Sequence, residues 1–426
     1  MERPLLHDRD VRTFLAGRTV SEIGSRITRE GLPIVAILTV GASAPQLGLL
    51  AALSSVAAMV AALGAGVLAD RMRRRPLMVG CDLARAALLS TIPLAAAFHR
   101  LTFLQIAVVT GLAGAVTVLF DVADQAWLPQ FVSRARLGQG NALVSGASAT
   151  GETCGPALMG ALFQWVGGPM AILFDAASYL ASAASLLAIR RREPPPAPAA
   201  PGSRRAGREA AAGLRAVFRH PILRPLALTV ATQSLFGGFH GALYELYALR
   251  TLRLDPLALG ILITAGGAGA LVGSAAAQRV ALRVGAGRAL LWAGLAAGAL
   301  SWLVPFAHGP RILAFGALLG AQLAGDAASA VFRVNEATLR QAVTPDAWLG
   351  RVTGSGRWLG GTASALGALA AGGLGALLGL RGALCIYSAG LVLAPLWLSG
   401  SRVRALSAAG GEPVPGVFPA ATVPGG

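Results

Sequence analysis

Apolar positions along the chain gather into long runs that are separated by shorter polar segments. Most runs approach the roughly 20 residues that a helix needs to cross a bilayer core about 30 Å thick. Several contain Gly or Pro, which transmembrane helices tolerate. The pattern predicts an all-α integral membrane protein with twelve transmembrane helices, at approximately residues 14–40, 47–69, 77–98, 103–127, 140–164, 169–189, 225–248, 257–280, 288–306, 312–334, 356–379 and 382–400.

The polar segments differ in arginine content, and this difference predicts the orientation of the chain. Arginine is enriched on the cytoplasmic side of membrane proteins. One side of the predicted topology collects Arg3, Arg9, Arg12, Arg71, Arg73, Arg74, Arg75, Arg134, Arg136, the arginines from Arg190 to Arg224, Arg279, Arg283, Arg288, Arg340, Arg351, Arg402 and Arg404. The other side collects Arg100, Arg250, Arg253, Arg311 and Arg381. We therefore expect an N-in, C-in topology with an even number of spans.

The longest polar break divides the apolar runs into six and six. It is rich in Arg, Pro, Ala, Gly and Ser, which is typical of a flexible linker, and it ends in a predicted amphipathic helix from Arg208 to Arg219. The end of the chain is rich in Pro, Gly and Ala, which indicates disorder. The expected organisation is an N-terminal six-helix half (1–189), a cytoplasmic linker (190–224), a C-terminal six-helix half (225–400) and a disordered cytoplasmic tail (401–426).

Composition narrows the classes of function. Apolar residues make up 55% of the chain and charged residues 13%, about half the charge of an ordinary soluble domain. The sequence contains no lysine, so it lacks the residue that a P-loop places on nucleotide phosphates. The net charge of +17 comes from arginines dispersed between apolar runs, which indicates membrane topology and not nucleic-acid binding. The three cysteines lie far apart without a CxxC pair, and we expect no metal site, catalytic residue or cofactor.

The two sets of six runs share an internal repeat. An offset of 212 residues aligns Phe120 with Phe332, Val122 with Val334, Asp124 with Glu336, Leu137 with Leu349, Gly138 with Gly350, Gly155 with Gly367 and Gly160 with Gly372. The matching acids and the matching Leu-Gly pairs fall at equivalent places in the two sets. This repeat indicates a duplication of a six-helix unit, and thus two parallel halves.

The segment between the second and third runs carries the most specific motif. It reads GVLADRMRRRPL from Gly66 to Leu77, and thus contains G-x-x-x-D-R-x-x-R-R. This pattern resembles the signature loop of the major facilitator superfamily of secondary transporters, although Arg73 stands where the family has a second glycine. The resemblance implies two six-helix halves that transport by alternating access. It also singles out Gly66, Asp70, Arg71 and Arg74.

The first predicted helix carries an unusual set of charges. Five ionisable residues fall within roughly 120° of arc at about 100° per residue, and they are Arg18, Glu22, Arg26, Arg29 and Glu30. Ionisable residues in membrane helices are functional candidates by default. Glu22, Glu30 and, on the fifth helix, Glu152 are therefore candidates for proton coupling. The alternative is a static ion network in which Arg18, Glu22 and Arg26, spaced four apart, hold the helix to its neighbours.

A Gly- and Pro-containing stretch in the fifth helix resembles the G-P-x-x-x-G element of exporters in the same superfamily. Its candidate residues are Gly151, Gly155, Pro156 and Gly160, and the alternative is generic close packing of helices. The stretch from Asp121 to Pro129, together with Asp82 and Arg85, resembles the subgroup that contains the enterobactin exporter and the macrolide efflux permeases.

The family resemblance also implies a gate on the cytoplasmic side. Asp70 would meet the positively polarised N-terminus of the eleventh helix, near Gly356. Arg74, or else Arg71, would reach Asp121 or Asp124 at the end of the fourth helix. The alternative is that these arginines only set topology.

These features together predict a secondary transporter in the bacterial plasma (inner) membrane. We expect a monomer that exports a small apolar or amphipathic molecule, such as a drug or a macrolide-like or siderophore-like compound, in exchange for protons. The partners would be the substrate, protons and the lipid bilayer, without nucleic acid. An uptake symporter, a lipid flippase and a membrane-embedded enzyme remain as alternatives.

Overall fold

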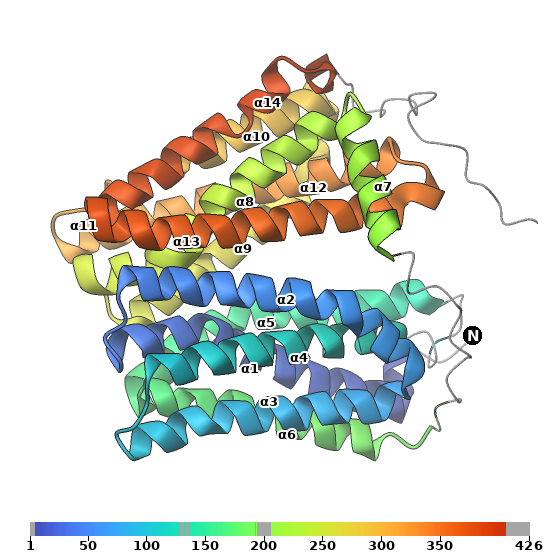
Figure 1. Cartoon of the computed structure of the whole chain (residues 1–426), viewed down its shortest axis with the longest axis vertical. Helices are drawn as coiled ribbons and strands as arrows, with labels where there is room; N and C mark the ends of the chain where they lie inside the picture. Colours follow the sequence, from blue (N-terminus) through green and yellow to red (C-terminus); the bar gives the residue numbers. More distant parts are fainter. Residues whose placement is uncertain (1–4, 128–131, 133–135, 192, 194–205, 406–426) are drawn as a thin grey trace, which may run out of the picture. The chain divides into compact units, whose positions relative to one another are not determined.

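The long apolar runs fold as helices in a computed structural model, which describes residues 5–127, 132, 136–191, 193 and 206–405. The regular structure of these residues is entirely helical (Figure 1). Contacts group the chain into two units, one of Met1–Pro201 with Ala248–Thr264 and the other of Gly202–Tyr247 with Ala265–Gly426. Each unit buries its own hydrophobic core.

The first unit contains six long helices. They are α1 (Arg9–Leu38), α2 (Ala44–Arg71), α3 (Arg74–Ala97), α4 (Phe103–Trp127), α5 (Leu137–Val166) and α6 (Gly168–Ala188). Helix α1 packs against α5 and α6, α2 packs against α4, and α3 packs against α4 and α6 (Figure 1). Phe14 of α1 meets the buried ring of Trp127 of α4 edge to face, with ring centroids 4.9 Å apart. This contact joins the beginning of α1 to the end of α4.

The second unit is assembled around α8 and α13. The elements that follow the linker are α7 (Ala206–Arg219), α8 (Leu223–Leu246), η5 (Tyr247–Thr251), α9 (Pro256–Val284), α10 (Ala286–Ser301), α11 (Arg311–Gly320), η6 (Ala321–Gly325), α12 (Asp326–Ala342), α13 (Asp346–Leu393) and α14 (Leu396–Ser399). Most of η5 and the first turns of α9 group with the first unit, and the other elements form the second unit. Helix α8 packs along α13, α10 packs against α12 and α13, and α7 lies on α13 (Figure 1). The predicted amphipathic helix of the linker is thus present as α7.

Two features reconcile these elements with the twelve predicted spans. Helices α11 and α12 are joined through the π-helix η6 without a break, so they form one rod. Within α13, Gly379 has a φ of 76° and separates two helices, because only glycine adopts this conformation without steric cost. The predicted start of the eleventh span at residue 356 was wrong, since α13 begins at Asp346. Its first turns are polar, and a search for apolar runs cannot detect them.

Length and hydropathy alone identify fewer spans. Seven helical segments of the described residues qualify: Ala44–Ala65, Arg74–Ala97, Phe103–Gln125, Gly168–Ala188, Pro256–Val284, Arg311–Ala342 and Asp346–Ser399. Helix α10 falls short because it has only 16 residues. Helix α1 is not among the seven, and it carries the five ionisable residues between Arg18 and Glu30. Those charges need partners within the protein.

Candidate functional site

Arg18 of α1 is the centre of an ion network that joins three helices. Its guanidinium donates to Glu22 Oε1 at 3.0 Å and also to a carboxylate oxygen of Asp124 in α4. The hydroxyl of Ser148 in α5 donates to Glu22 Oε1 at 3.0 Å. The side chains of Arg18 and Asp124 are only 12% and 4% exposed, whereas Glu22 retains 24%. One cation is therefore shared by two carboxylates, and one of the two has partial access to the surroundings.

The other ionisable residues predicted on α1 form ion pairs that are more exposed. Arg26 contacts Glu152 of α5 at 2.6 Å, but the Glu152 side chain is 58% exposed. Exposed ion pairs contribute little to stability. Among the cations of the described residues, Glu30 forms an ion pair with Arg29 alone, at 4.0 Å, and the Arg29 side chain is 70% exposed. The charged stripe thus lies toward α4 and α5 at Arg18, Glu22 and Arg26, and Glu22 is its most constrained acid.

Glycines of α5 allow this face of α1 to come close. A Cβ atom at Gly151 would lie 2.9 Å from backbone and side-chain atoms of Glu22. A Cβ atom at Gly155 would collide with the side chain of Arg26. Gly160 serves a different contact, because a Cβ atom there would lie 2.6 Å from the carbonyl oxygen of Pro256 at the start of α9. The helix-five motif therefore provides close approach at several separate points, as small residues do between membrane helices.

The proposed gate residues lie at the end of α2 and of α4. Gly66 and Asp70 belong to the last turns of α2, and the side chain of Asp70 lies outside the described part of the structure. Arg71 and Asp121 are exposed. Asp124, one of the two acids expected for Arg74 or Arg71, is paired with Arg18 in this conformation. The assignment of a gate stays a prediction.

The beginning of α3 binds an acid that the sequence alone did not reveal as its partner. The carboxylate of Glu193 accepts hydrogen bonds from the backbone N–H groups of Arg74 and Arg75, at 2.6 and 3.0 Å. Free N–H groups at the start of a helix bind acidic side chains in this way. The signal available in the sequence was a lone acid directly after three arginines at the end of α6. Spacing alone could not connect it to a helix that begins more than 100 residues earlier.

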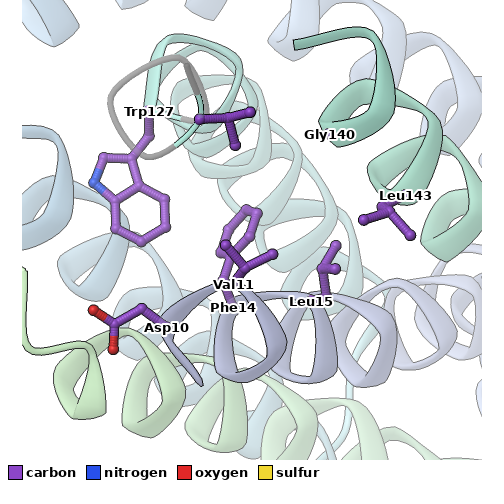
Figure 2. A pocket seen from close by; sticks show the side chains of 8 residues that line it. Asp10, Val11, Phe14, Leu15, Trp127, Gly140 and Leu143 are labelled. Carbon is purple, nitrogen blue, oxygen red and sulfur yellow. The ribbon is translucent and has the colours of Figure 1, made fainter. Parts of the chain in front are cut away.

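A small pocket lies where α1 begins, α4 ends and α5 begins. Figure 2 shows its lining, which consists of Asp10, Val11, Phe14, Leu15, Trp127, Val132, Gly140 and Leu143. The lining is apolar apart from Asp10, whose carboxylate accepts from the backbone N–H groups of Arg190 and Arg191 at 3.4 and 3.2 Å. The pocket therefore presents a mostly apolar wall, and its single acid already binds the segment that follows α6.

Metal ligands do not converge anywhere in the described residues. No group of three or more His, Cys, Asp or Glu side chains within this part of the chain is arranged to hold a metal ion.

Comparison with known proteins identifies the family. A model described as Major Facilitator Superfamily matches residues 20–319. An uncharacterized MFS-type transporter, y4rN of Sinorhizobium fredii, is 31% identical over 236 residues, which cover 53% of this chain and 54% of the relative. The multidrug efflux pump Tap of Mycolicibacterium fortuitum is 28% identical over 261 residues, which cover 57% of this chain and 62% of the relative. The chain thus spans only 54% and 62% of the length of these two curated relatives.

Solved structures agree on the fold. A bacterial homologue of the iron transporter ferroportin in an inward-facing state has a TM-score of 0.75 at 18% identity, with 93% of this chain and 99% of that chain covered. The nucleoside transporter NupG has a TM-score of 0.74 at 13% identity, with 92% and 98% covered. At these identities the likeness shows the fold alone. Since the family model also covers well over half of the sequence, the chain belongs to the major facilitator superfamily and is a multi-pass membrane transporter, not an enzyme.

Proposed function

We propose that the protein exports a small apolar or amphipathic compound in exchange for protons. The observation that carries this proposal is the sharing of Arg18 by Glu22 and Asp124. If one of the two acids binds a proton, the other still neutralises Arg18, so the network can change its charge without leaving a buried cation unpaired. Glu22, with 24% exposure and a position inside α1, is the acid best placed to exchange that proton.

The proposal includes an architecture and an orientation. The six helices before the linker and the six after it form two parallel halves, with both termini in the cytoplasm of a bacterium and the protein as a monomer in the inner membrane. The arginine asymmetry and the repeat at an offset of 212 residues support this arrangement. The name of the relative Tap, a multidrug efflux pump, supports export of drug-like compounds.

A gate formed by Asp70 and the arginines that follow it completes the proposed cycle. Asp70 binds the N-terminus of the eleventh helix when the substrate cavity opens outward, and it releases that helix when the cavity opens inward. Its place in the G-x-x-x-D-R motif supports this role. The interaction of one carboxylate with a helix N-terminus is worth about 0.3 to 2 kcal/mol, enough to shift a balanced equilibrium between two states.

Reconstituted vesicles with an imposed pH gradient test the function. Wild-type protein should move substrate against its gradient when protons flow the opposite way, and Glu22→Gln should abolish this coupling. Glu22→Asp is the matched control, because it keeps a carboxylate and should retain coupling. Glu30→Gln and the double variant with Glu22→Gln cover the second acid of α1, and Glu152→Gln covers the acid of α5.

The same experiment separates the alternatives. Transport of substrate in the same direction as protons would show an uptake symporter, and translocation of labelled lipid without efflux of small compounds would show a flippase. Uphill export by the Glu22→Gln, Glu30→Gln double variant would contradict the assignment of the proton site to α1.

A further inference from the structure

A second ionisable cluster lies inside the first unit and has no role in the network around Arg18. Asp82 and Arg85 of α3 and Asp175 of α6 are 0%, 2% and 0% exposed. Arg85 donates to Asp82 Oδ1 at 2.5 Å. Its guanidinium lies over the rings of Phe120 and Tyr179, 4.4 and 4.0 Å from their centroids. Arg85 is thus fixed in place by α3, α4 and α6 together, and its ion-pair partner is Asp82.

Asp175 lies in the same cluster without a cation of its own. Its Oδ1 atom accepts from the hydroxyl of Ser178 at 3.0 Å, whereas its Oδ2 atom is buried and has no hydrogen-bond partner. Within the described residues, no arginine or histidine nitrogen lies close enough to Asp175 to form an ion pair. The hydroxyl of Thr28 in α1 is also buried beside this carboxyl group. The hydrogen-bonding groups beside Asp175 are therefore neutral hydroxyls, and the charged members of the cluster are Asp82 and Arg85.

The charges of the cluster determine whether the ionised or the protonated form of Asp175 is more stable. Arg85 neutralises Asp82, so an ionised Asp175 would add a second negative charge that no cation compensates. An uncompensated buried charge costs several kcal/mol, even after the protein relaxes around it. A protonated carboxyl group avoids this cost and gains an O–H donor for a nearby acceptor. The burial and the pairing thus favour a proton on Asp175 in this conformation.

Every element around Asp175 contributes to this environment. Helix α3 presents Asp82 and Arg85, and α6 itself presents Tyr179. Helix α1 presents Gly24, where a Cβ atom would lie 2.6 Å from Asp175 Oδ1. Helix α5 meets α6 through Phe163, near Gly168 at the start of α6. The carboxyl group therefore sits in a notch that a glycine of α1 leaves open.

Helix α1 separates the two ionisable clusters. At about 100° per residue, Gly24 lies roughly 200° around the helix from Glu22. Gly17 and Gly31, seven residues on either side of Gly24, also lie against residues of α6. One face of α1 thus contacts Asp124 and Ser148, and the opposite face covers Asp175. A displacement of α1 from α6 would open the notch around Asp175.

We propose that Asp175 is a second proton-binding residue of this transporter, which keeps its proton while Gly24 of α1 covers it and releases the proton when α1 and α6 separate. On release the O–H bond of the carboxyl group breaks, water accepts the proton, and Arg85 then faces two carboxylates, Asp82 and Asp175. The part that this proton plays in transport rests on the proposed proton antiport. The presence of the proton on Asp175 does not depend on the proposed antiport.

Infrared spectroscopy of the purified protein in lipid bilayers tests the proton directly. A protonated carboxyl group has a C=O band that a carboxylate lacks, and hydrogen–deuterium exchange shifts it. We expect such a band near neutral pH in the wild type and its loss in Asp175→Asn, which has nearly the same shape. An identical carboxyl spectrum in the two proteins would overturn the proposal.

Two further variants, Asp82→Asn and Ser178→Ala, test the same infrared band without a change at Asp175. Asp82→Asn leaves Arg85 without its anion, so we expect Asp175 to ionise in compensation and the same band to disappear. If Asp175→Asn does not accumulate, Ser178→Ala replaces it: the loss of the hydroxyl that binds Oδ1 should shift the band, and an unmoved band would overturn the proposal. In transport assays Asp175→Asn should flatten the dependence of efflux on pH, whereas a purely structural Asp175 would leave the pH profile unchanged.

The infrared and transport experiments test the two proposals separately. A wild-type protein that moves substrate without protons would contradict the proposed antiport, yet the carboxyl band could still identify Asp175. A missing band in a protein that does exchange protons would contradict only the assignment of Asp175.

Discussion

Gly151 of α5 lies directly against Glu22 of α1, so that a Cβ atom at position 151 would be 2.9 Å from the carbonyl oxygen of Glu22. The same helix presents Ser148, one turn earlier, to the Glu22 carboxylate. The close approach at the glycine therefore brings the serine hydroxyl within bonding distance. A packing feature of α5 thus determines the hydrogen bonding of the candidate proton-exchanging acid.

Substitution of Gly151 by alanine should disturb this arrangement. The added methyl group must push α1 and α5 apart, and overpacking of this kind costs about 1 to 3 kcal/mol. We expect Gly151→Ala to lower the unfolding temperature and to reduce proton-coupled efflux. Gly146→Ala is the matched control on the same helix, because a Cβ atom there meets nothing within 4 Å. Equal behaviour of the two variants would contradict the close contact at Gly151.

Loss of Arg18 should destabilise the first unit through the two acids that it pairs. Arg18→Gln leaves Asp124, with a side chain only 4% exposed, without its cation. Removal of one partner of a buried ion pair costs about 3 to 5 kcal/mol. The double variant with Asp124→Asn removes the stranded charge and should recover part of the loss. Thermal unfolding of the wild type, both single variants and the double variant measures the coupling between the two residues, and strictly additive effects would show that there is none.

Helical periodicity predicted the charged face of α1 but not what that face contacts. Arg18, Glu22 and Arg26 follow from their spacing of four residues, whereas Asp124 lies 106 residues from Arg18 in the chain. No local pattern encodes such a contact. The spacing of Asp82 and Arg85 was equally visible in the sequence, but their complete burial results from the packing of α3 against α4 and α6. The partnership between Gly24 and Asp175 was hidden for the same reason, since a glycine reveals its purpose only when the neighbouring helix is known.

Neutralisation of Asp70 tests the proposed gate. Asp70→Asn should shift the protein toward its inward-open state, because it weakens an interaction that forms only in the outward-open state. The measurement is the labelling rate of single cysteines on the two faces of the membrane, in a background without Cys81, Cys154 and Cys385. If the arginines of this loop only set topology, the variant should be harmless, because acids contribute little to orientation.

An acid in another loop provides the control for Asp70. Asp255 accepts a hydrogen bond from the backbone N–H of Ala258 at 2.8 Å at the start of α9. Asparagine caps helices as well as aspartate does, so Asp255→Asn should leave the ratio of labelling rates unchanged. Normal transport and an unchanged ratio in Asp70→Asn as well would remove Asp70 from the gate.

His220 should make the stability of the protein depend on pH. It lies between α7 and α8, is fully buried, and its Nδ1 atom accepts from the backbone N–H groups of Ile222 and Leu223, both at 3.2 Å. Burial lowers the pKa of His220 below its ordinary value of 6.5. Below that value the unfolded chain binds a proton that the folded protein excludes. Stability is therefore complete above pH 6.5 and decreases as the pH falls toward the lowered pKa.

Asparagine at position 220 should remove this dependence while it keeps an acceptor for the two N–H groups. The wild-type unfolding temperature should decrease as the pH falls below about 6.5, because this one group lowers the free energy of unfolding by no more than about 1.4 kcal/mol per pH unit. The difference between the wild type and His220→Asn should therefore change with pH only in that range. His99→Asn is the matched control, since His99 is exposed and has a φ of 54° that asparagine tolerates. Parallel curves for the wild type and His220→Asn would show that His220 does not titrate on unfolding.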